Sequence, residues 1–364
     1  MKKIGGITFH ASHNYGSCLQ AYALQEYIKD NFQDYEYKII NFRTKKQKEI
    51  YCKPLRTKSI FGFLVKLFYL KSLNLKYKKF EDFINKKLQI TEEFENESEF
   101  VNKYDVLLAA GDQIWNPRCW DFSWLYFFKD VKSDCKISYA PSMGPRGGSL
   151  TNDEKIIIKE SLKDFKIIGV RENGTKRIID DLLLSSKEVK VLPDPVLLLS
   201  KQKWASLIEE TKINIRKPYI LFYTLNASYE TYKTVKKIGK LLKLPVYITK
   251  PVRKCDYLHF FSNYFSVGPL EFLKMISDAA LVLTTSFHAC VFSAIFNKKF
   301  FAINVNNDNR IRGFLEEYKL ENCFITSNDN YLEKINNDTI DYSSFENKLN
   351  VHKKDVYEFF NQIL

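Results

Sequence analysis

The stretch Tyr104-Asp105-Val106-Leu107-Leu108-Ala109-Ala110-Gly111-Asp112-Gln113 determines the fold class that we expect for this chain. The unbroken apolar run from Val106 to Ala110 predicts a short strand that is buried in the protein. Gly111 and the polar residues after it end this strand in a loop. A buried strand of this kind needs other elements to cover it, so the rest of the chain is expected to supply strands and helices around it.

The same pattern, an apolar strand that ends in a polar loop, recurs on both sides of residues 104–113. We predict further strands at 4–9, 37–42, 137–140, 167–172, 189–195, 219–224, 245–249, 280–284 and 300–303. Helical periodicity separates most of them, at 18–28, 175–184, 201–210, 229–242, 269–277 and 289–296. Strands that alternate with helices indicate parallel sheets with helices on their faces. The chain is therefore predicted to be an α/β protein.

Length and composition indicate two packed domains. A chain of 364 residues exceeds what one hydrophobic core usually covers. We place a Rossmann-like domain at 1–205, with a basic helical insertion at 43–90, a second one at 206–344, and a terminal helix at 345–364. Seven cysteines without a CxxC pair or paired Cys/His spacing argue against a disulfide framework and against a metal site. The first ten residues contain no apolar run typical of a secretory signal, so we expect a cytoplasmic protein.

Most of the net charge of +13 lies in one segment. Residues 43–87 contain two Arg and twelve Lys against Glu49, Glu81 and Asp82, a balance of +11. This segment includes an apolar and aromatic run at 60–70 that is too short to span a bilayer. Two interpretations stay open: peripheral contact of 43–87 with the anionic inner face of the cytoplasmic membrane, or two packed helices whose lysines are merely solvated. Without a nucleic-acid-binding motif, we do not expect nucleic acid as a partner.

Five motifs, in order along the chain, resemble the polysaccharide pyruvyl transferase family. They are Asn14-Tyr15-Gly16 with Leu19-Gln20-Ala21-Tyr22-Ala23-Leu24, Gly111-Asp112-Gln113-Ile114-Trp115, Ser138-Tyr139-Ala140-Pro141-Ser142-Met143-Gly144, Val170-Arg171-Glu172 and Ser286-Phe287-His288-Ala289. The resemblance implies a GT-B-like arrangement of the two domains, with the terminal helix crossing back. It also implies transfer of the carboxyvinyl part of phosphoenolpyruvate to a sugar, which gives a pyruvate ketal and phosphate. Phosphoenolpyruvate is then the donor substrate, and no cofactor is expected.

Phosphoenolpyruvate carries a phosphate and a carboxylate, so its site needs fixed cations and the backbone N–H groups of a helix N-terminus. Arg171 directly follows a predicted strand, and Ser286, Phe287 and His288 form the turn before a predicted helix. We predict that these residues bind the donor and that His288 is the acid/base. An ion pair of Arg171 with an acidic neighbour, and a purely structural His288, are the alternatives.

One donor-binding cation of the family is missing from this chain. Many members have Arg-Leu-His where this sequence has Ser286-Phe287-His288, so serine stands at the arginine position. The nearest candidates to replace that arginine are Lys250, Arg253, Arg310 and Arg312.

The acceptor sugar is predicted to bind to the first domain. Asp112 is expected to orient or deprotonate an acceptor hydroxyl, with Gln113 beside it and the indole of Trp115 stacked on a sugar face. Asn14, Gly16 and Ser17, at the first strand-to-helix turn, are the other predicted acceptor-binding residues. Capping of a following helix is the alternative role for Asp112. Turn formation with N-capping is the alternative for Asn14, Gly16 and Ser17.

Three functions fit this sequence. The first is a pyruvyl transferase that acts on a capsule, exopolysaccharide or cell-wall sugar, either free or linked to a lipid pyrophosphate. The second is a glycosyltransferase of the same architecture that uses a nucleotide sugar. The third is a non-catalytic subunit that binds a sugar or a lipid phosphate.

Overall fold

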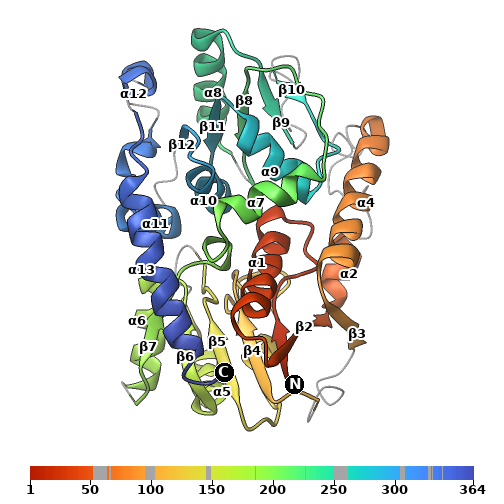
Figure 1. Cartoon of the computed structure of the whole chain (residues 1–364), viewed down its shortest axis with the longest axis vertical. Helices are drawn as coiled ribbons and strands as arrows, with labels where there is room; N and C mark the ends of the chain where they lie inside the picture. The colour runs from red at the N-terminus through yellow and green to blue at the C-terminus, as the bar shows by residue number, and fades with distance from the viewer. Residues whose placement is uncertain are drawn as a thin grey trace. The chain divides into compact units, whose positions relative to one another are not determined.

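The chain forms two compact units, each built around a parallel sheet (Figure 1). The computed structural model describes residues 1–51, 64, 67–94, 103–144, 149–184, 186–225, 227–249, 261–303, 308–326, 329, 331–337 and 339–364. Unit 1 comprises Met1–Cys52, Asp82–Leu199 and Asn350–Leu364, and unit 2 comprises Lys53–Glu81 and Ser200–Leu349.

The sheet of unit 1 has seven parallel strands. In spatial order they are β3 (Ile90–Phe94), β2 (Tyr35–Phe42), β1 (Lys2–Ile7), β4 (Val106–Ala110), β5 (Lys136–Tyr139), β6 (Phe165–Val170) and β7 (Val189–Val191). The helical segments of this unit are α1 (Tyr15–Asn31), α2 (Lys45–Tyr51), η2 (Trp124–Phe127), α5 (Asn152–Lys163), α6 (Asn173–Leu183) and η3 (Pro195–Leu197). The direction of winding reverses between β1 and β4, which is where open α/β sheets bind their ligands.

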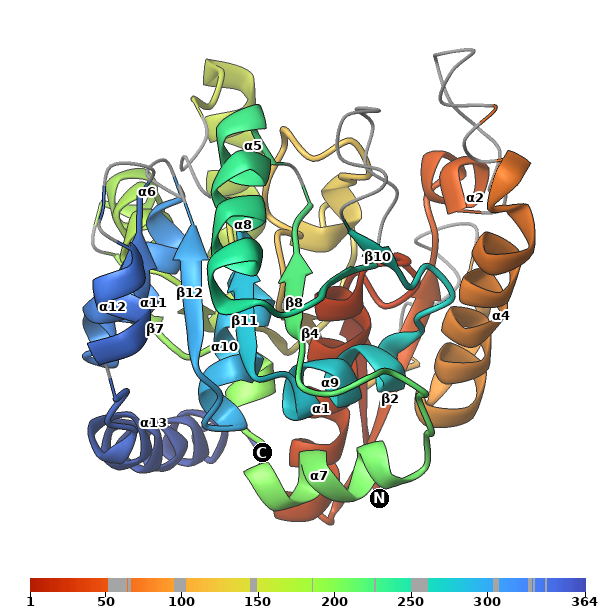
Figure 2. The same ribbon diagram turned by 90° about the horizontal axis from the view of Figure 1, so that it is seen from above.

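The sheet of unit 2 has six parallel strands and repeats this order. They are β10 (Ser262–Asn263), β9 (Val246–Ile248), β8 (Ile220–Tyr223), β11 (Leu281–Thr284), β12 (Phe300–Ile303) and β13 (Phe324–Ile325). Figure 2 shows β8, β11 and β12 pointing the same way, as their parallel pairing requires. The helical segments are α7 (Lys201–Glu209), α8 (Tyr229–Leu242), α9 (Pro269–Asp278), α10 (Phe287–Ile295), α11 (Asn309–Glu317), η5 (Glu321–Cys323) and α12 (Tyr331–Asn337). The reversal of winding in this unit lies between β8 and β11.

The predicted fold class is confirmed: both sheets are parallel, and helices separate most of their strands. The stretch that determined the expectation forms β4, whose residues Val106–Ala110 are all buried. The terminal helix is α13 (Ser343–Phe360), and the division between the units falls within it, because residues from Asn350 onward belong to unit 1. The predicted return of the chain to its first unit is therefore present.

The basic insertion does not belong wholly to the first unit. The helix α4 (Leu70–Lys87) is divided, with residues up to Glu81 in unit 2. Tyr69, which precedes α4, lies edge-on against Phe265 with ring centroids 4.7 Å apart, and Lys79 pairs with Glu271 at 2.8 Å. These contacts with unit 2 explain why residues 53–81 depart from the predicted boundary at 205.

A search of the described helices for membrane spans finds none that combines the required length with the required hydrophobicity.

Candidate functional site

In unit 1 a short hydrogen bond lies at the point where the winding reverses. Ser17, in the first turn of α1, donates its hydroxyl proton to Asp112 Oδ2 at 2.5 Å. Asp112 Oδ1 accepts a second hydrogen bond from the backbone N–H of Gln113 at 2.8 Å. The bond between Ser17 and Asp112 joins the segment after β1 to the loop after β4. It therefore brings together two of the predicted site residues at the position where this class of sheet binds ligands.

The backbone around Asp112 is left-handed. Gly111 has a φ of 61° and Asp112 a φ of 51°, and Ala140, at the end of the neighbouring β5, has a φ of 53°. A side chain at Gly111 would collide with the amide of Gln20, which explains the glycine. Left-handed conformations of non-glycine residues are uncommon and concentrate at functional sites, where the surrounding structure stabilises them. Asp112 and Ala140 lie at the carboxyl edge of this sheet, so the edge carries two such residues beside the candidate site.

Arg171 lies at the same edge, where it forms ion pairs. Its Nη1 donates to Asp194 Oδ2 at 2.9 Å, and its Nε lies 3.3 Å from Glu172 Oε2. Burial by itself lowers the pKa of the Arg171 guanidinium, but the charges of Glu172, Asp194 and Asp112 together raise it above its ordinary value. The structure therefore has the ion pair that was the alternative to donor binding. Donor binding by Arg171 stays a prediction, and two carboxylates already compete for its charge.

Asp121 is a buried carboxyl near this edge that the sequence analysis did not select. It is 5% exposed and accepts a hydrogen bond from Gln47 Nε2 at 3.2 Å. Burial raises the pKa of Asp121 to about 6; the hydrogen bond from Gln47 opposes this rise, and the charge of Asp112 adds to it. The one sequence signal is that Asp121 stands between two aromatic residues, Trp120 and Phe122. A carboxyl that titrates close to neutral pH suits acid/base chemistry.

The raised pKa of Asp121 makes unfolding pH-dependent. Its ordinary value is 3.8. Folding therefore favours the protonated form, so the stability that this proton gives is fully present below pH 4 and is lost as the pH rises to about 6. We expect Asp121→Asn to raise the free energy of unfolding by roughly 2–3 kcal/mol at pH 8 and by much less at pH 4. Urea denaturation at both pH values measures this, with Asp134→Asn as the exposed control. An equal effect of Asp121→Asn at both pH values would contradict the assignment.

The remaining predicted acceptor residues also lie in unit 1, and they make different kinds of contact there. Asn14 caps α1, accepting from the backbone N–H of Gly16 at 3.1 Å, as the capping alternative for these two residues required. The side chain of Gln113 accepts from Asn116 at 3.1 Å. No helix begins after Asp112, where the chain makes a turn, so the capping alternative for Asp112 is wrong. Whether Asp112 and Gln113 contact an acceptor stays a prediction.

The expectation for Trp115 is wrong. Its side chain is 0% exposed, and its ring stacks on Phe127 with centroids 4.8 Å apart. The indole N–H donates to the backbone carbonyl of Tyr126 at 2.9 Å. An indole that is enclosed in the core and satisfied in this way cannot stack on a sugar.

In unit 2 a second polar cluster lies where the winding reverses between β8 and β11. Thr224 Oγ1 and Thr285 Oγ1, which follow these strands, lie 2.7 Å apart. Thr284 Oγ1 donates to the Tyr223 carbonyl at 2.7 Å and accepts from the backbone N–H of Ser286 at 3.0 Å. These bonds fix the chain just before α10 begins at Phe287.

His288 is the second residue of α10 and is 9% exposed. The ring of Phe287 lies edge-on to the imidazole with centroids 5.3 Å apart and also contacts Phe314. Ser286 is the N-cap residue, but its side chain makes no capping hydrogen bond. The first N–H groups of a helix have no partner within the helix, so they can donate to an anion. Ser286, Phe287 and His288 are thus brought together at this helix terminus, as predicted.

The structure treats the four candidates for the missing cation differently. Lys250 and Arg253 lie outside the described residues. Arg310 makes two hydrogen bonds to Asp308, at 3.0 Å and 2.7 Å, so its charge is already paired. Arg312 is the fourth residue of the short α11 and is exposed. Among the described residues, Arg310 is therefore a weaker candidate than its sequence position suggested.

The sequence model of the polysaccharide pyruvyl transferase family matches residues 14–307. The chain belongs to this family. Family membership confirms the resemblance and makes the chain a transferase of polysaccharide biosynthesis. The match covers both reversal points, with Ser17 and Asp112 at one and Ser286 to His288 at the other.

Several solved structures of enzymes that act on sugars are similar to this chain. The alignment with a UDP-N-acetylglucosamine 2-epimerase covers 99% of this chain and 95% of the epimerase chain, at 10% identity and a TM-score of 0.56. The alignment with sucrose-phosphate synthase from Thermosynechococcus elongatus covers 100% of this chain and 99% of the synthase chain, at 9% identity and a TM-score of 0.54. The alignment with the UDP-GlcNAc 2-epimerase of Methanocaldococcus jannaschii covers 100% of both chains, at 13% identity and a TM-score of 0.50. At these identities the likeness establishes the GT-B-like fold alone. No curated protein matches the chain.

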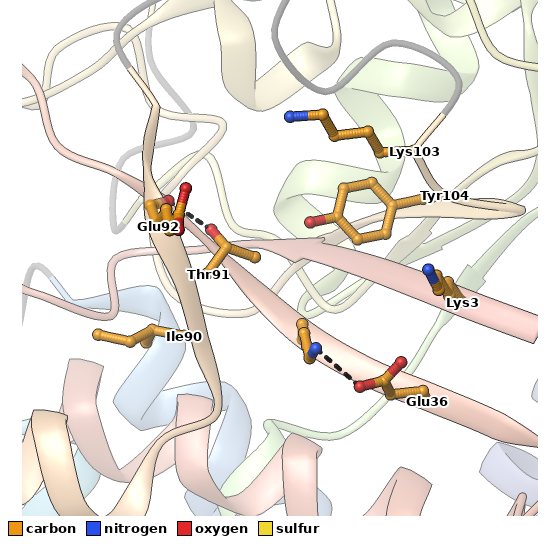
Figure 3. A pocket seen from close by; sticks show the side chains of 8 residues that line it. Lys3, Glu36, Ile90, Thr91, Glu92, Lys103 and Tyr104 are labelled. Carbon is orange, nitrogen blue, oxygen red and sulfur yellow. Dashed lines mark hydrogen bonds and ion pairs between the residues drawn. The ribbon is translucent and has the colours of Figure 1, made fainter.

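A hollow of about 470 Å³ lies at the opposite, amino edge of the unit 1 sheet. Figure 3 shows Lys3, Glu36 and Tyr104 around it, with Lys103 nearby. Gly5 allows the ring of Tyr104 to lie against β1, because a side chain there would meet that ring. Its position, far along the strands from their carboxyl ends, separates this hollow from the candidate site.

Proposed function

We propose that the chain transfers the carboxyvinyl part of phosphoenolpyruvate to a sugar of a cell-surface polysaccharide or of its lipid-linked precursor. The observation that carries the proposal is the turn Ser286-Phe287-His288, which begins α10 within a chain of the pyruvyl transferase family. A histidine at a helix N-terminus that lacks a side-chain cap combines a proton carrier with backbone donors for an anion.

We assign the donor to unit 2. Phosphoenolpyruvate needs donors for its phosphate and its carboxylate, and the first N–H groups of α10 supply them next to His288. Arg171 in unit 1 is matched by Glu172 and Asp194, so it offers less to an anion than its charge suggests. Lys250 and Arg253, which the sequence selects, are the further cations in this assignment.

We assign the acceptor to unit 1. Its carboxyl edge carries Asp112 and Glu172, and carboxylates are strong acceptors for sugar hydroxyls. Asp112 is held at 2.5 Å by the hydroxyl of Ser17, so its position is fixed before a ligand arrives. We propose that Asp112 orients or deprotonates the first attacking hydroxyl.

The reaction forms two C–O bonds and breaks one. His288 gives a proton to the methylene carbon of the enol, and the resulting oxocarbenium-like C2 is attacked by a sugar hydroxyl. The bond from C2 to the phosphate oxygen breaks, and a second hydroxyl of the sugar closes the ketal. Of the two hydroxyl protons, one replaces the proton that His288 gave, and the other leaves with inorganic phosphate. The reaction consumes no oxidant or reductant.

The proposal is tested by giving the full chain phosphoenolpyruvate and a panel of free and lipid-linked β-galactoside acceptors. We expect phosphate release that depends on the acceptor, together with a gain of the pyruvate mass by that acceptor. Calorimetry with phosphoenolpyruvate alone separates a binding failure from an acceptor failure. No heat with phosphoenolpyruvate and no release of phosphate with any acceptor would overturn the donor assignment.

The serine at position 286 favours one second candidate. Because the family arginine is absent there, the chain has one cation fewer for phosphoenolpyruvate, as a transferase that uses a nucleotide sugar would allow. Such an enzyme would release a nucleotide instead of inorganic phosphate. The same assay with UDP-N-acetylglucosamine and UDP-glucose distinguishes the two, while a non-catalytic binding subunit would bind without turnover.

A further inference from the structure

The segment that begins α4 carries an exposed stripe in which apolar and basic side chains alternate. Phe68 is 82% exposed, Leu67 48% and Leu75 45%, and Leu64 further upstream is 56% exposed. Lys71 and Lys78 are exposed. Leu75 and Lys78, three residues apart within α4, lie on the same face of that helix, and Phe68 and Lys71 are exposed at its start. We call Leu67, Phe68, Lys71, Leu75 and Lys78 the α4 stripe.

Other residues of α4 and the residue before it anchor this segment to unit 2. Lys79 pairs with Glu271 at 2.8 Å, and Lys76 Nζ donates to the carbonyl of Thr249 at 3.4 Å. Tyr69 packs edge-on against Phe265. The segment is therefore held against unit 2, and the exposure of Phe68 and Leu75 is not the result of a detached segment.

The chain is positively charged up to the end of the stripe. Residues 51–80 contain seven Lys and one Arg but no Asp or Glu, and Glu81 and Asp82 come one turn after Lys78. Of these, Lys76 and Lys79 serve contacts within unit 2, whereas Lys71 and Lys78 are exposed beside the apolar side chains. Exposed phenylalanine and leucine between lysines are typical of helices that lie in the interface of an anionic membrane.

We propose that the α4 stripe docks the protein on an anionic phospholipid surface, with Phe68, Leu67 and Leu75 inserted among the headgroups and Lys71 and Lys78 on their phosphates. A lipid surface accommodates both kinds of side chain at once. Nucleic acid would leave three apolar side chains in contact with phosphates. This docking does not depend on the donor or on catalysis, so its test contains no substrate.

The test is co-sedimentation of the full chain with vesicles of phosphatidylcholine alone and of phosphatidylcholine with one third phosphatidylglycerol. We expect binding to the anionic vesicles only, and a loss of that binding as salt is raised. Phe68→Glu is expected to weaken partitioning about tenfold, and Lys71→Glu with Lys78→Glu by at least about twentyfold, because each lysine near an anionic surface contributes about fivefold. None of these side chains is buried, so circular dichroism should show unchanged folding.

A matched control exists on another helix of the same unit. Leu241 at the end of α8 is 49% exposed, and Lys237 lies exposed one turn before it. Leu241→Glu and Lys237→Glu should leave vesicle binding within about twofold of the parent, because they lie outside the α4 stripe. Equal binding to neutral and anionic vesicles, equal losses from both sets of variants, or retention by duplex DNA but not by vesicles would each overturn the proposal.

Discussion

Replacement of His288 by alanine is expected to lower the rate of pyruvyl transfer by roughly 10²- to 10⁴-fold. The imidazole is the side chain of the α10 turn that can carry a proton, and the bonds of Thr284 and Thr285 fix the chain beside it. Without it, water must protonate the methylene carbon. The measurement is the initial rate of phosphate release from phosphoenolpyruvate at saturating acceptor, with thermal unfolding measured in parallel.

His352 offers a matched control for this prediction. It is also 9% exposed, but it lies on α13, which is not an element that follows a strand at either reversal point. We expect His352→Ala to change the rate by less than about threefold while costing similar stability. If both alanine variants lower the rate equally, or if His288→Gln retains the parental rate, then His288 is a structural residue.

Replacement of Asp194 by alanine is expected to lower the free energy of unfolding of unit 1 by about 3–5 kcal/mol. The Asp194 side chain is 0% exposed, receives Arg171 Nη1 at 2.9 Å and caps η3 through the backbone N–H of Val196 at 3.1 Å. Its removal leaves a buried guanidinium with one acidic partner fewer, and that uncompensated charge is the main cost. Urea denaturation followed by the near-ultraviolet signal measures the effect.

The double variant Arg171→Met with Asp194→Leu tests whether the cost of Asp194→Ala comes from the unpaired charge of Arg171. Because it removes both charges, it should recover a large part of the stability that Asp194→Ala loses. Glu160→Ala, which breaks the exposed pair with Lys163, is the control and should change the free energy of unfolding by less than about 1 kcal/mol. A loss below about 1 kcal/mol for Asp194→Ala would show that the ion pair is not a structural element.

The sequence was sufficient to predict the strands that are buried on both faces. β4, β8, β11 and β12 consist of buried residues throughout, and an apolar run is the direct consequence of such burial. The edge strand β3, with the sequence Ile-Thr-Glu-Glu-Phe, was not predicted, because a half-exposed edge strand needs no apolar run. The helix α5 was also missed, although Thr151 and Glu154 form a complete capping box at its start.

The location of the candidate site residues was predictable where a residue comes soon after a strand. Asp112, Arg171 and His288 each follow a buried strand closely, and parallel strands bring such positions to one edge of a sheet. Partners across the edge were not predictable, since nothing local indicates that Asp194 would hold Arg171 or that Ser17 would reach Asp112. Trp115 was misassigned because an aromatic residue after a strand fits a sugar platform and a core side chain equally well.

The central claim is that phosphoenolpyruvate is the donor, and transfer of its C2 carbon tests this most directly. Phosphoenolpyruvate labelled with ¹³C at C2 would be incubated with the full chain and the acceptor panel, and the products would be followed by carbon and phosphorus NMR. We predict a labelled ketal carbon on the sugar and one inorganic phosphate for each ketal, both absent with His288→Ala. Unlabelled sugar products throughout, together with nucleotide release from a UDP-sugar by the same preparation, would contradict the account.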